Sequence, residues 1–246
     1  MKIIGVIPAR YQSSRFPGKV LAVLKGRPLI EHVYRQAQKA KILDEVVVVT
    51  DDDRVVKAVQ DFGGVVRKFT GDFRSGSDRA AYLAREIEAD IFMNIQADEP
   101  FIAPEVIAGV TEPFQAPGVL MTTAATPVLS ETEWVDTNAV KVVVDRFGDA
   151  LYFTRASIPY ERDNQGRLPK TAAYKHLGIY GFRRDFLLKF ASWPTGVLEE
   201  IEQLEQLRAQ ENGTKIRVVI TPFDSQCVDT PEDLEKAKGQ IQKGIN

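Results

Sequence analysis

Short apolar runs rich in valine and isoleucine alternate along the chain with amphipathic stretches of helical length, an alternation typical of parallel βαβ units. The apolar runs cover residues 3–7, 46–50, 91–96, 120–125, 140–144, 151–154 and 218–220. Helices are expected near 28–40, 52–62, 77–88 and 104–114. Because the runs are apolar on both sides, helices should cover both faces of the sheet. The sequence therefore predicts an α/β fold with a Rossmann-like, mostly parallel sheet flanked by helices.

The central third of the chain departs from this alternation. Residues 145–150 join two apolar runs through a turn that contains Gly148, which predicts a β-hairpin. Residues 157–170 are polar and rich in turn-forming residues, which predicts a loop. The 246 residues suffice for a single domain with a well-buried core, and no repeat or clear linker divides them.

The composition excludes several classes of protein. The 32 Lys and Arg residues against 34 Asp and Glu residues give a net charge of −2, so no overall basic field attracts nucleic acid. The single cysteine, Cys227, cannot form an internal disulfide or a cysteine-based zinc site. No apolar stretch reaches about 18 residues, so neither a membrane span nor a leader is expected, and a cytoplasmic location is predicted.

A cationic loop follows the first apolar run, where ligands bind in open α/β sheets. It carries three cations and two hydroxyls, namely Arg10, Arg15, Lys19, Ser13 and Ser14. Gly18 lets the backbone approach a ligand closely. These groups suit a polyphosphate, although the sequence is not a Walker A loop because Val20 follows Lys19. A solvated surface loop without function is the alternative.

Two acids distant in sequence are candidates for a magnesium site. Asp98 follows the run 91–96, and Asp229 follows a strand-like stretch at 215–223, so both are expected near the carboxyl edge of the sheet. The alternative for Asp229 is a helix start, with Thr230 as N-cap and Pro231 as the first helical residue. A further acidic cluster, 51–53, precedes a predicted helix and is interpreted as its cap.

Residues 198–209 are predicted to form one amphipathic helix. Its apolar half carries Leu198, Ile201, Leu204 and Leu207. Arg208 projects into the same half and is expected to pair with Glu205, three residues earlier. The opposite half carries Glu199, Glu202 and Gln206. These residues are equally consistent with the wall of a pocket and with a solvated face.

A series of short motifs extends over nearly the whole chain. They are IPAR at 7–10, SSRFPGK at 13–19, SGSDR at 75–79, NIQADEP at 94–100, NAVKVV at 138–143, ALYF at 150–153, HLGIY at 176–180, LEQLR at 204–208 and VDTPED at 228–233. In this order they resemble the 3-deoxy-manno-octulosonate cytidylyltransferases, also called CMP-KDO synthetases. The resemblance implies that the anomeric hydroxyl of an eight-carbon sugar acid attacks the α-phosphate of CTP and releases pyrophosphate, for lipopolysaccharide synthesis.

The resemblance also implies roles for individual residues. Catalysis would involve Arg10, Lys19 and Asp98, with Mg2+ on Asp98 and Asp229. The nucleotide would contact Pro8, Ala9, Arg10, Ser14, Arg15, Lys19, Ser75, Gly76 and Arg79. The sugar would contact Gln96, Arg155, His176, Tyr180, Glu202 and Gln206, and Lys141 is a further cationic candidate. The nucleotide-binding part would be mainly 1–125 and 212–246, the sugar-binding and dimerisation part mainly 126–211, and the protein a homodimer.

The sequence departs from the family pattern at Ala97, where the family has glycine, at Val20 in place of proline, and in 223–227. These departures leave the sugar open, including an 8-amino relative of KDO. Three alternatives are another CMP-sugar or sugar-phosphate nucleotidyltransferase, a glycosyltransferase that binds metal at 51–53, and a nucleotide-binding regulator without turnover.

Overall fold

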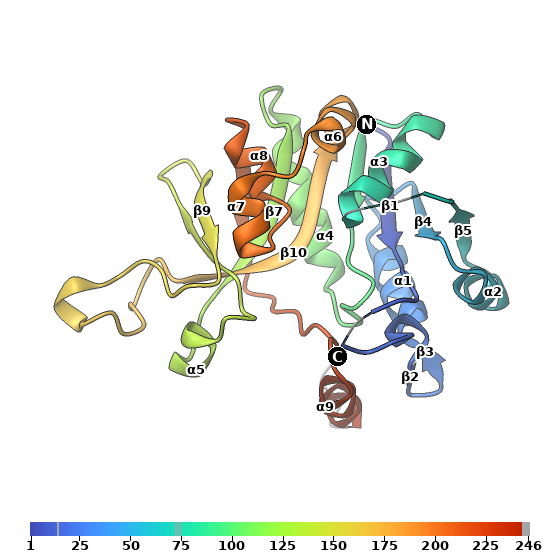
Figure 1. Cartoon of the computed structure of the whole chain (residues 1–246), viewed down its shortest axis with the longest axis horizontal. Coiled ribbons are helices and arrows are strands. Elements are labelled where there is room, and N and C mark those ends of the chain that lie inside the picture. The colour runs from blue at the N-terminus through green and yellow to red at the C-terminus, as the bar shows by residue number, and fades with distance from the viewer. Residues whose placement is uncertain (14, 72, 74, 243–246) are drawn as a thin grey trace. The chain divides into compact units, whose positions relative to one another are not determined.

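The computed structural model describes residues 1–242 except 14, 72 and 74 (Figure 1). The chain divides into two compact units. Unit 1 comprises Met1–Ala108 and Ser225–Asn246, and unit 2 comprises Gly109–Asp224. Residues 109–125 and 212–224, which the sequence division placed in the nucleotide-binding part, therefore lie in unit 2.

Unit 1 contains a parallel sheet in which β6, β1, β4 and β5 lie in that order (Figure 1). The strands are β1 (Ile3–Pro8), β4 (Glu45–Thr50), β5 (Val65–Lys68) and β6 (Ile91–Asn94). The helices are α1 (Leu29–Lys39), α2 (Asp53–Asp61), α3 (Gly76–Glu86) and α9 (Pro231–Gln242), and α4 (Pro104–Thr111) spans the unit boundary. Because βαβ crossovers are right-handed, this strand order puts α1 and α2 on one face of the sheet and α3 on the other. The predicted α/β arrangement is thus confirmed.

Side-chain caps explain where several helices of unit 1 begin. The Asp52 side chain accepts a bond from the Arg54 backbone at the start of α2, and Ser75 and Asp78 form a capping box at α3. At α9, the Thr230 hydroxyl accepts from the backbone N–H of Asp233. The predicted capping roles of the 51–53 cluster and of Thr230 are therefore confirmed at Asp52 and Thr230.

Unit 1 also contains short elements between β1 and α1 that the sequence did not predict. They are η1 (Lys19–Leu21) and a hairpin of β2 (Val23–Leu24) and β3 (Arg27–Pro28). Leu24 and Leu29 pack with Val228, Leu234 and Ala237 in one buried cluster. This cluster holds the segment before α9 against the start of the chain.

Unit 2 combines parallel and antiparallel strands. They are β7 (Met121–Pro127), β8 (Lys141–Val144), β9 (Ala150–Thr154), β10 (Tyr174–Arg183) and β11 (Ile216–Ile220). β11 pairs parallel with β7, whereas β10 pairs antiparallel with β7 and β8. β8 and β9 form the predicted hairpin, which is confirmed. Other elements are η2 (Glu112–Gln115), α5 (Glu131–Val135), η3 (Arg162–Asn164) and α6 (Arg184–Ser192).

The single helix predicted at 198–209 is wrong. The segment forms two short helices, α7 (Val197–Glu202) and α8 (Leu207–Glu211), because Gln203 adopts a left-handed conformation with φ of 55°. Arg208 pairs with Glu199, at 2.6 Å between Nη2 and Oε1, a contact that the sequence did not predict. Glu199 and Gln206 are buried, which excludes the solvated face that the sequence left open for them.

No helix in the described part of the chain is long and apolar enough to cross a membrane.

Candidate active site

The cationic loop of unit 1 is folded back on itself after β1. The Gly18 backbone donates to the Tyr11 carbonyl at 2.8 Å, and Gly18 has a left-handed φ of 71°. A β-carbon at Gly18 would lie 3.0 Å from the Tyr11 ring, so both the backbone conformation and the available space favour glycine. The Arg54 guanidinium covers this ring, 3.3 Å from its centroid. The fold of the loop leads directly into Lys19 at the start of η1.

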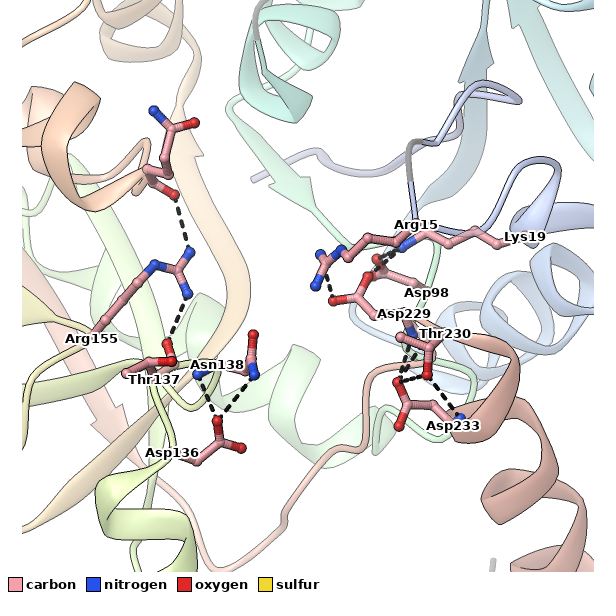
Figure 2. A network of polar contacts seen from close by, with 11 residues as sticks. Arg15, Lys19, Asp98, Asp136, Thr137, Asn138, Arg155, Asp229, Thr230 and Asp233 are labelled. Atoms are coloured by element: carbon pink, nitrogen blue, oxygen red, sulfur yellow. Dashed lines mark hydrogen bonds and ion pairs between the residues drawn. The ribbon is translucent and has the colours of Figure 1, made fainter.

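The Lys19 ammonium lies between two carboxylates (Figure 2). Its Nζ donates to Asp98 Oδ2 at 2.5 Å and to Asp229 Oδ1 at 2.7 Å, and Arg15 reaches Asp229 Oδ2 at 2.9 Å. The Val228 backbone donates to the Asp98 carbonyl at 2.9 Å, which fastens the two acidic segments together. The predicted convergence of Asp98, Asp229 and the cationic loop is confirmed.

The electrostatics of this cluster favour charged groups. Burial alone would lower the pKa of Lys19, but the neighbouring carboxylates of Asp98 and Asp229 outweigh it and raise that pKa above its ordinary value of 10.5. The Lys19 side chain is only 13% exposed, and those of Asp98 and Asp229 are 20% and 29% exposed. The charges of two acids and two cations thus cancel in a partly desolvated cluster.

The donor set suits a hard divalent cation. Asp98, Asp229 and Cys227 each offer a ligand atom, and these atoms lie within 4.8 Å of one another. Carboxylate oxygens are the ligands that Mg2+ prefers. Burial raises the pKa of the Cys227 thiol, and the nearby Asp98 and Asp229 raise it further, so this sulfur stays protonated and is a poor ligand for such an ion. The fit therefore rests on the two carboxylates.

The residues predicted for the base and ribose also lie in unit 1. Ser75 is the N-cap of α3, and Gly76 packs so closely that a β-carbon would lie 3.2 Å from Asn94 and 3.3 Å from Pro8. Ala9 is buried, and its backbone donates to the Val49 carbonyl. Ser14 lies outside the described residues.

Arg79 lies among charged and aromatic groups. Its guanidinium is 3.6 Å from Asp51 and 5.3 Å from the centroid of Phe73. Burial lowers the pKa of Arg79, and the positive charge of Arg10 acts in the same direction while Asp51 opposes it. Arg10 and Arg79 therefore lie near enough to repel each other, an arrangement that favours an anion near both. The contact of Asp51 with Arg79 was not foreseen, because the 51–53 cluster was interpreted as a helix cap or, in one alternative, as a metal site.

Ala97 is accommodated without strain. It is buried at 6% exposure and is not among the described residues with positive φ. The left-handed conformation that only glycine adopts easily is therefore not needed at this position. Gln96 is half-buried in the same unit, and its carbonyl accepts from the Glu99 backbone at 3.4 Å.

In unit 2, Glu202 organises one group of the predicted sugar residues. Its carboxylate accepts from the Thr154 hydroxyl at 2.5 Å and from the Arg155 backbone at 3.0 Å. The Arg155 guanidinium donates to the Thr137 carbonyl at 3.0 Å (Figure 2). It also donates to the Glu202 carbonyl at 2.8 Å. These bonds fix Arg155 by main-chain contacts from two segments of unit 2.

Lys141 is a fully buried cation in the same unit. Its Nζ donates to the carbonyls of Asp136 and Ala139, at 2.7 and 2.5 Å. Burial lowers the pKa of Lys141, Asp136 opposes this change, and the charge of Arg155 lowers the pKa further. Lys141 and Arg155 together therefore support the backbone at 136–139.

His176, Tyr180 and Gln206 form a second group in unit 2. His176 Nε2 lies 2.8 Å from the Thr123 hydroxyl, which itself donates to the Ile179 carbonyl at 2.7 Å. Because that hydroxyl has only one proton, Nε2 carries the imidazole hydrogen and Nδ1 is an acceptor. The Tyr180 hydroxyl donates to Gln206 Oε1 at 2.9 Å, and the rings of His176 and Tyr180 lie 5.4 Å apart.

The stability of the protein should depend on His176 below neutral pH. Burial lowers the pKa of His176 to about 3, from an ordinary 6.5. As pH falls from 6.5 toward 3, His176 becomes protonated in the unfolded chain but stays neutral in the folded protein. We expect this residue to remove about 1.4 kcal/mol of unfolding free energy per pH unit in that window. His176→Gln should give a shallower loss in urea titrations between about pH 7 and about pH 5, and an unchanged slope would contradict this.

Comparisons with known proteins define the class of the molecule. The sequence model of the family described as Cytidylyltransferase matches residues 4–216. A 3-deoxy-manno-octulosonate cytidylyltransferase of Pelobacter propionicus is 47% identical, over 98% of this chain and 98% of its own length. One from Solibacter usitatus is 49% identical, over 99% of this chain and 96% of its own length. The fold, the site and these matches define a nucleotidyltransferase.

The structural comparison agrees with this class. A solved CMP:2-keto-3-deoxy-manno-octonic acid synthetase complexed with CTP is 40% identical, covering 99% of this chain and 100% of its own, with a TM-score of 0.92. The chain belongs to the 3-deoxy-manno-octulosonate cytidylyltransferase family.

Proposed function

We propose that this enzyme transfers CMP from CTP to the anomeric hydroxyl of 3-deoxy-manno-octulosonate and releases pyrophosphate. The observation that carries this proposal is a cluster of ion pairs. Lys19 and Arg15, from the loop after β1, contact two acids, Asp98 after β6 and Asp229 before α9. The names of the relatives supply the substrates. No protein nucleophile is required, because the sugar hydroxyl is the attacking group.

The cationic loop supplies the charge that a triphosphate needs. CTP carries about four negative charges, so Arg10, Arg15 and Lys19 would neutralise much of it through charge-assisted hydrogen bonds. The same cations would stabilise the charge that grows on pyrophosphate as it leaves. In this proposal the base and ribose contact the start of α3, at Ser75, Gly76 and Arg79, and the end of β1, at Pro8 and Ala9.

Asp98 and Asp229 would hold Mg2+ in this proposal. When bound, Mg2+ neutralises phosphate oxygens and lowers the pKa of the attacking hydroxyl. The two carboxylates fix the position of that charge relative to the cationic loop, because the Val228–Asp98 backbone bond joins the segments that carry them.

The sugar acid is assigned to polar residues of unit 2, and Gln96 of unit 1 is kept as a separate candidate. His176 would accept a hydrogen bond from a sugar hydroxyl at Nδ1, since its Nε2 hydrogen is directed to the Thr123 hydroxyl. The Tyr180–Gln206 pair and Glu202 offer further polar groups, and Arg155 offers a positive charge for the sugar carboxylate. Hydrogen bonds of this kind favour a polyhydroxylated acid over an apolar acceptor.

We propose a homodimer formed by unit 2. Val197 and Ile201 of α7 and Leu151 of β9 are apolar side chains at least 62% exposed. Apolar side chains gathered on adjacent elements are typical of protein interfaces. The reaction is assigned to the cytoplasm, where CTP is available, and to lipopolysaccharide synthesis.

A pyrophosphate-release assay with Mg2+ tests the function directly. We expect release with CTP and 3-deoxy-manno-octulosonate, and much less with UTP or with either substrate alone. A panel containing the 8-amino analogue and other CMP-sugar precursors identifies the acceptor. Release only with a different sugar would replace the proposed acceptor, and CTP binding without any release would support a regulator instead.

A further inference from the structure

The oxygen atoms that suit a metal ion already accept bonds from cations of the chain. Lys19 donates hydrogen bonds to Asp98 Oδ2 and Asp229 Oδ1, and Arg15 forms an ion pair with Asp229 Oδ2. Mg2+ binds carboxylate oxygens at about 2.1 Å, so it cannot share the place between the carboxylates with an ammonium group. A metal ion and the Lys19 ammonium therefore compete for the same two acids.

The balance of charge makes such an exchange feasible. Two carboxylates carry −2, and Lys19 with Arg15 carries +2, so the cluster is neutral. A divalent ion on the same carboxylates also gives neutrality, and it frees both side chains. The freed charge of +2 matches the net charge of about −2 of a triphosphate that brings a second divalent ion of its own. The exchange thus leaves no uncompensated charge in a partly buried place.

We infer that Lys19 is a displaceable counter-ion, held by Asp98 and Asp229 until a divalent ion releases it to bind the triphosphate. The inference rests on the metal site of the proposed function. Arg15 assists, but its side chain is 59% exposed, so its bond to Asp229 contributes less than that of Lys19, which is 13% exposed.

This exchange couples the two ligands. A metal ion that displaces Lys19 prepares the cation for phosphate, and a phosphate that attracts Lys19 vacates the carboxylates for metal. Such coupling is reciprocal, so nucleotide should raise metal affinity by the same factor as metal raises nucleotide affinity. Lys19 accordingly opposes metal binding without nucleotide and supports it with nucleotide.

The test measures Mn2+ binding by electron paramagnetic resonance of the free ion, with the whole protein. Without nucleotide, Lys19→Met should bind Mn2+ about tenfold more tightly than the wild type, since the change removes a competing charge-assisted bond. With CTP present, the same variant should bind Mn2+ and nucleotide more weakly than the wild type. This reversal of sign separates the exchange from a general effect of charge.

Two control variants assign the effect to the cluster. Lys57→Met removes a lysine from an exposed pair with Asp61, at 2.8 Å on α2, and should leave Mn2+ binding unchanged. Asp229→Asn added to Lys19→Met should abolish the gain in affinity. Mn2+ should also raise the thermal stability of Lys19→Met more than that of the wild type, which shows that the variant is folded.

The outcomes distinguish this inference from the function on which it rests. If the wild type binds Mn2+ with CTP, and Lys19→Met binds Mn2+ without nucleotide no more tightly than the wild type does, the exchange is rejected while the metal site stands. If Asp98→Asn leaves Mn2+ binding with CTP unchanged, the metal site and the exchange are both rejected. If the double variant Lys19→Met with Asp229→Asn still binds Mn2+ more tightly than the wild type does, the exchange is also rejected.

Discussion

Replacement of Asp98 by asparagine is expected to lower the rate of pyrophosphate release by at least about a hundredfold while the protein stays folded. The amide has nearly the same shape as the carboxylate, but it lacks the charge that we propose to hold a metal ion. It also removes one of the two acids that bind Lys19. The Asp98 backbone carbonyl, which accepts from Val228, is unaffected. Steady-state assays with saturating CTP and sugar acid measure this change.

A matched change at Asp61 controls for the loss of a carboxylate. Asp61 lies in the same unit and pairs only with Lys57 on an exposed face in the contacts described, so Asp61→Asn should keep near-normal turnover. Circular dichroism and thermal melting check that both variants fold. Near-normal turnover of Asp98→Asn would reject the metal assignment.

Replacement of Glu199 by glutamine should lower the free energy of unfolding by about 3–5 kcal/mol. Glu199 accepts two bonds from the Arg208 guanidinium, at 2.8 and 2.6 Å, and the Arg208 side chain is fully buried. Glu199 also accepts from the Gly196 backbone at the start of α7. The change removes the Glu199 charge from beside a buried guanidinium, and urea titration measures the lost stability as a lower midpoint.

A second variant separates lost charge from lost packing. Glu199→Leu combined with Arg208→Met removes both charges, so it should be more stable than Glu199→Gln alone. The exposed pair of Lys57 and Asp61 gives the comparison, since its loss should cost only about 0.3–0.5 kcal/mol. A cost as small as this for Glu199→Gln would show that the buried pair is not structurally important.

Much of unit 1 was predicted correctly because its signals are local. The strands β1, β4 and β6 are apolar runs of four to six residues, and α2 and α3 begin at caps whose partners lie within a few positions. Asp52, Ser75 and Thr230 each bond to a backbone N–H two or three residues later. Short-range bonds of this kind depend on the immediate sequence alone.

The helix at 198–209 failed for the opposite reason. Its apolar residues recur with helical spacing, but Gln203 turns left-handed, and the nine-residue separation of Glu199 and Arg208 closes an ion pair across the break. A periodic pattern says which residues prefer burial, and it cannot say which partner a buried charge will find. The contact of Thr123 with His176, 53 positions apart, escaped prediction in the same way.

The sequence by itself determined the α/β class, the helix caps, the hairpin at 145–150 and the kind of groups that could meet polyphosphate and metal, because these follow from propensity, periodicity and residue chemistry. The tertiary structure alone decided that Lys19 lies between Asp98 and Asp229, although 210 positions separate it from the latter. The Val228–Asp98 backbone bond and the packing of α9 with Leu24 and Leu29 bring these charges together. The energy of an ion pair depends on distance and burial, and both are properties of the folded chain.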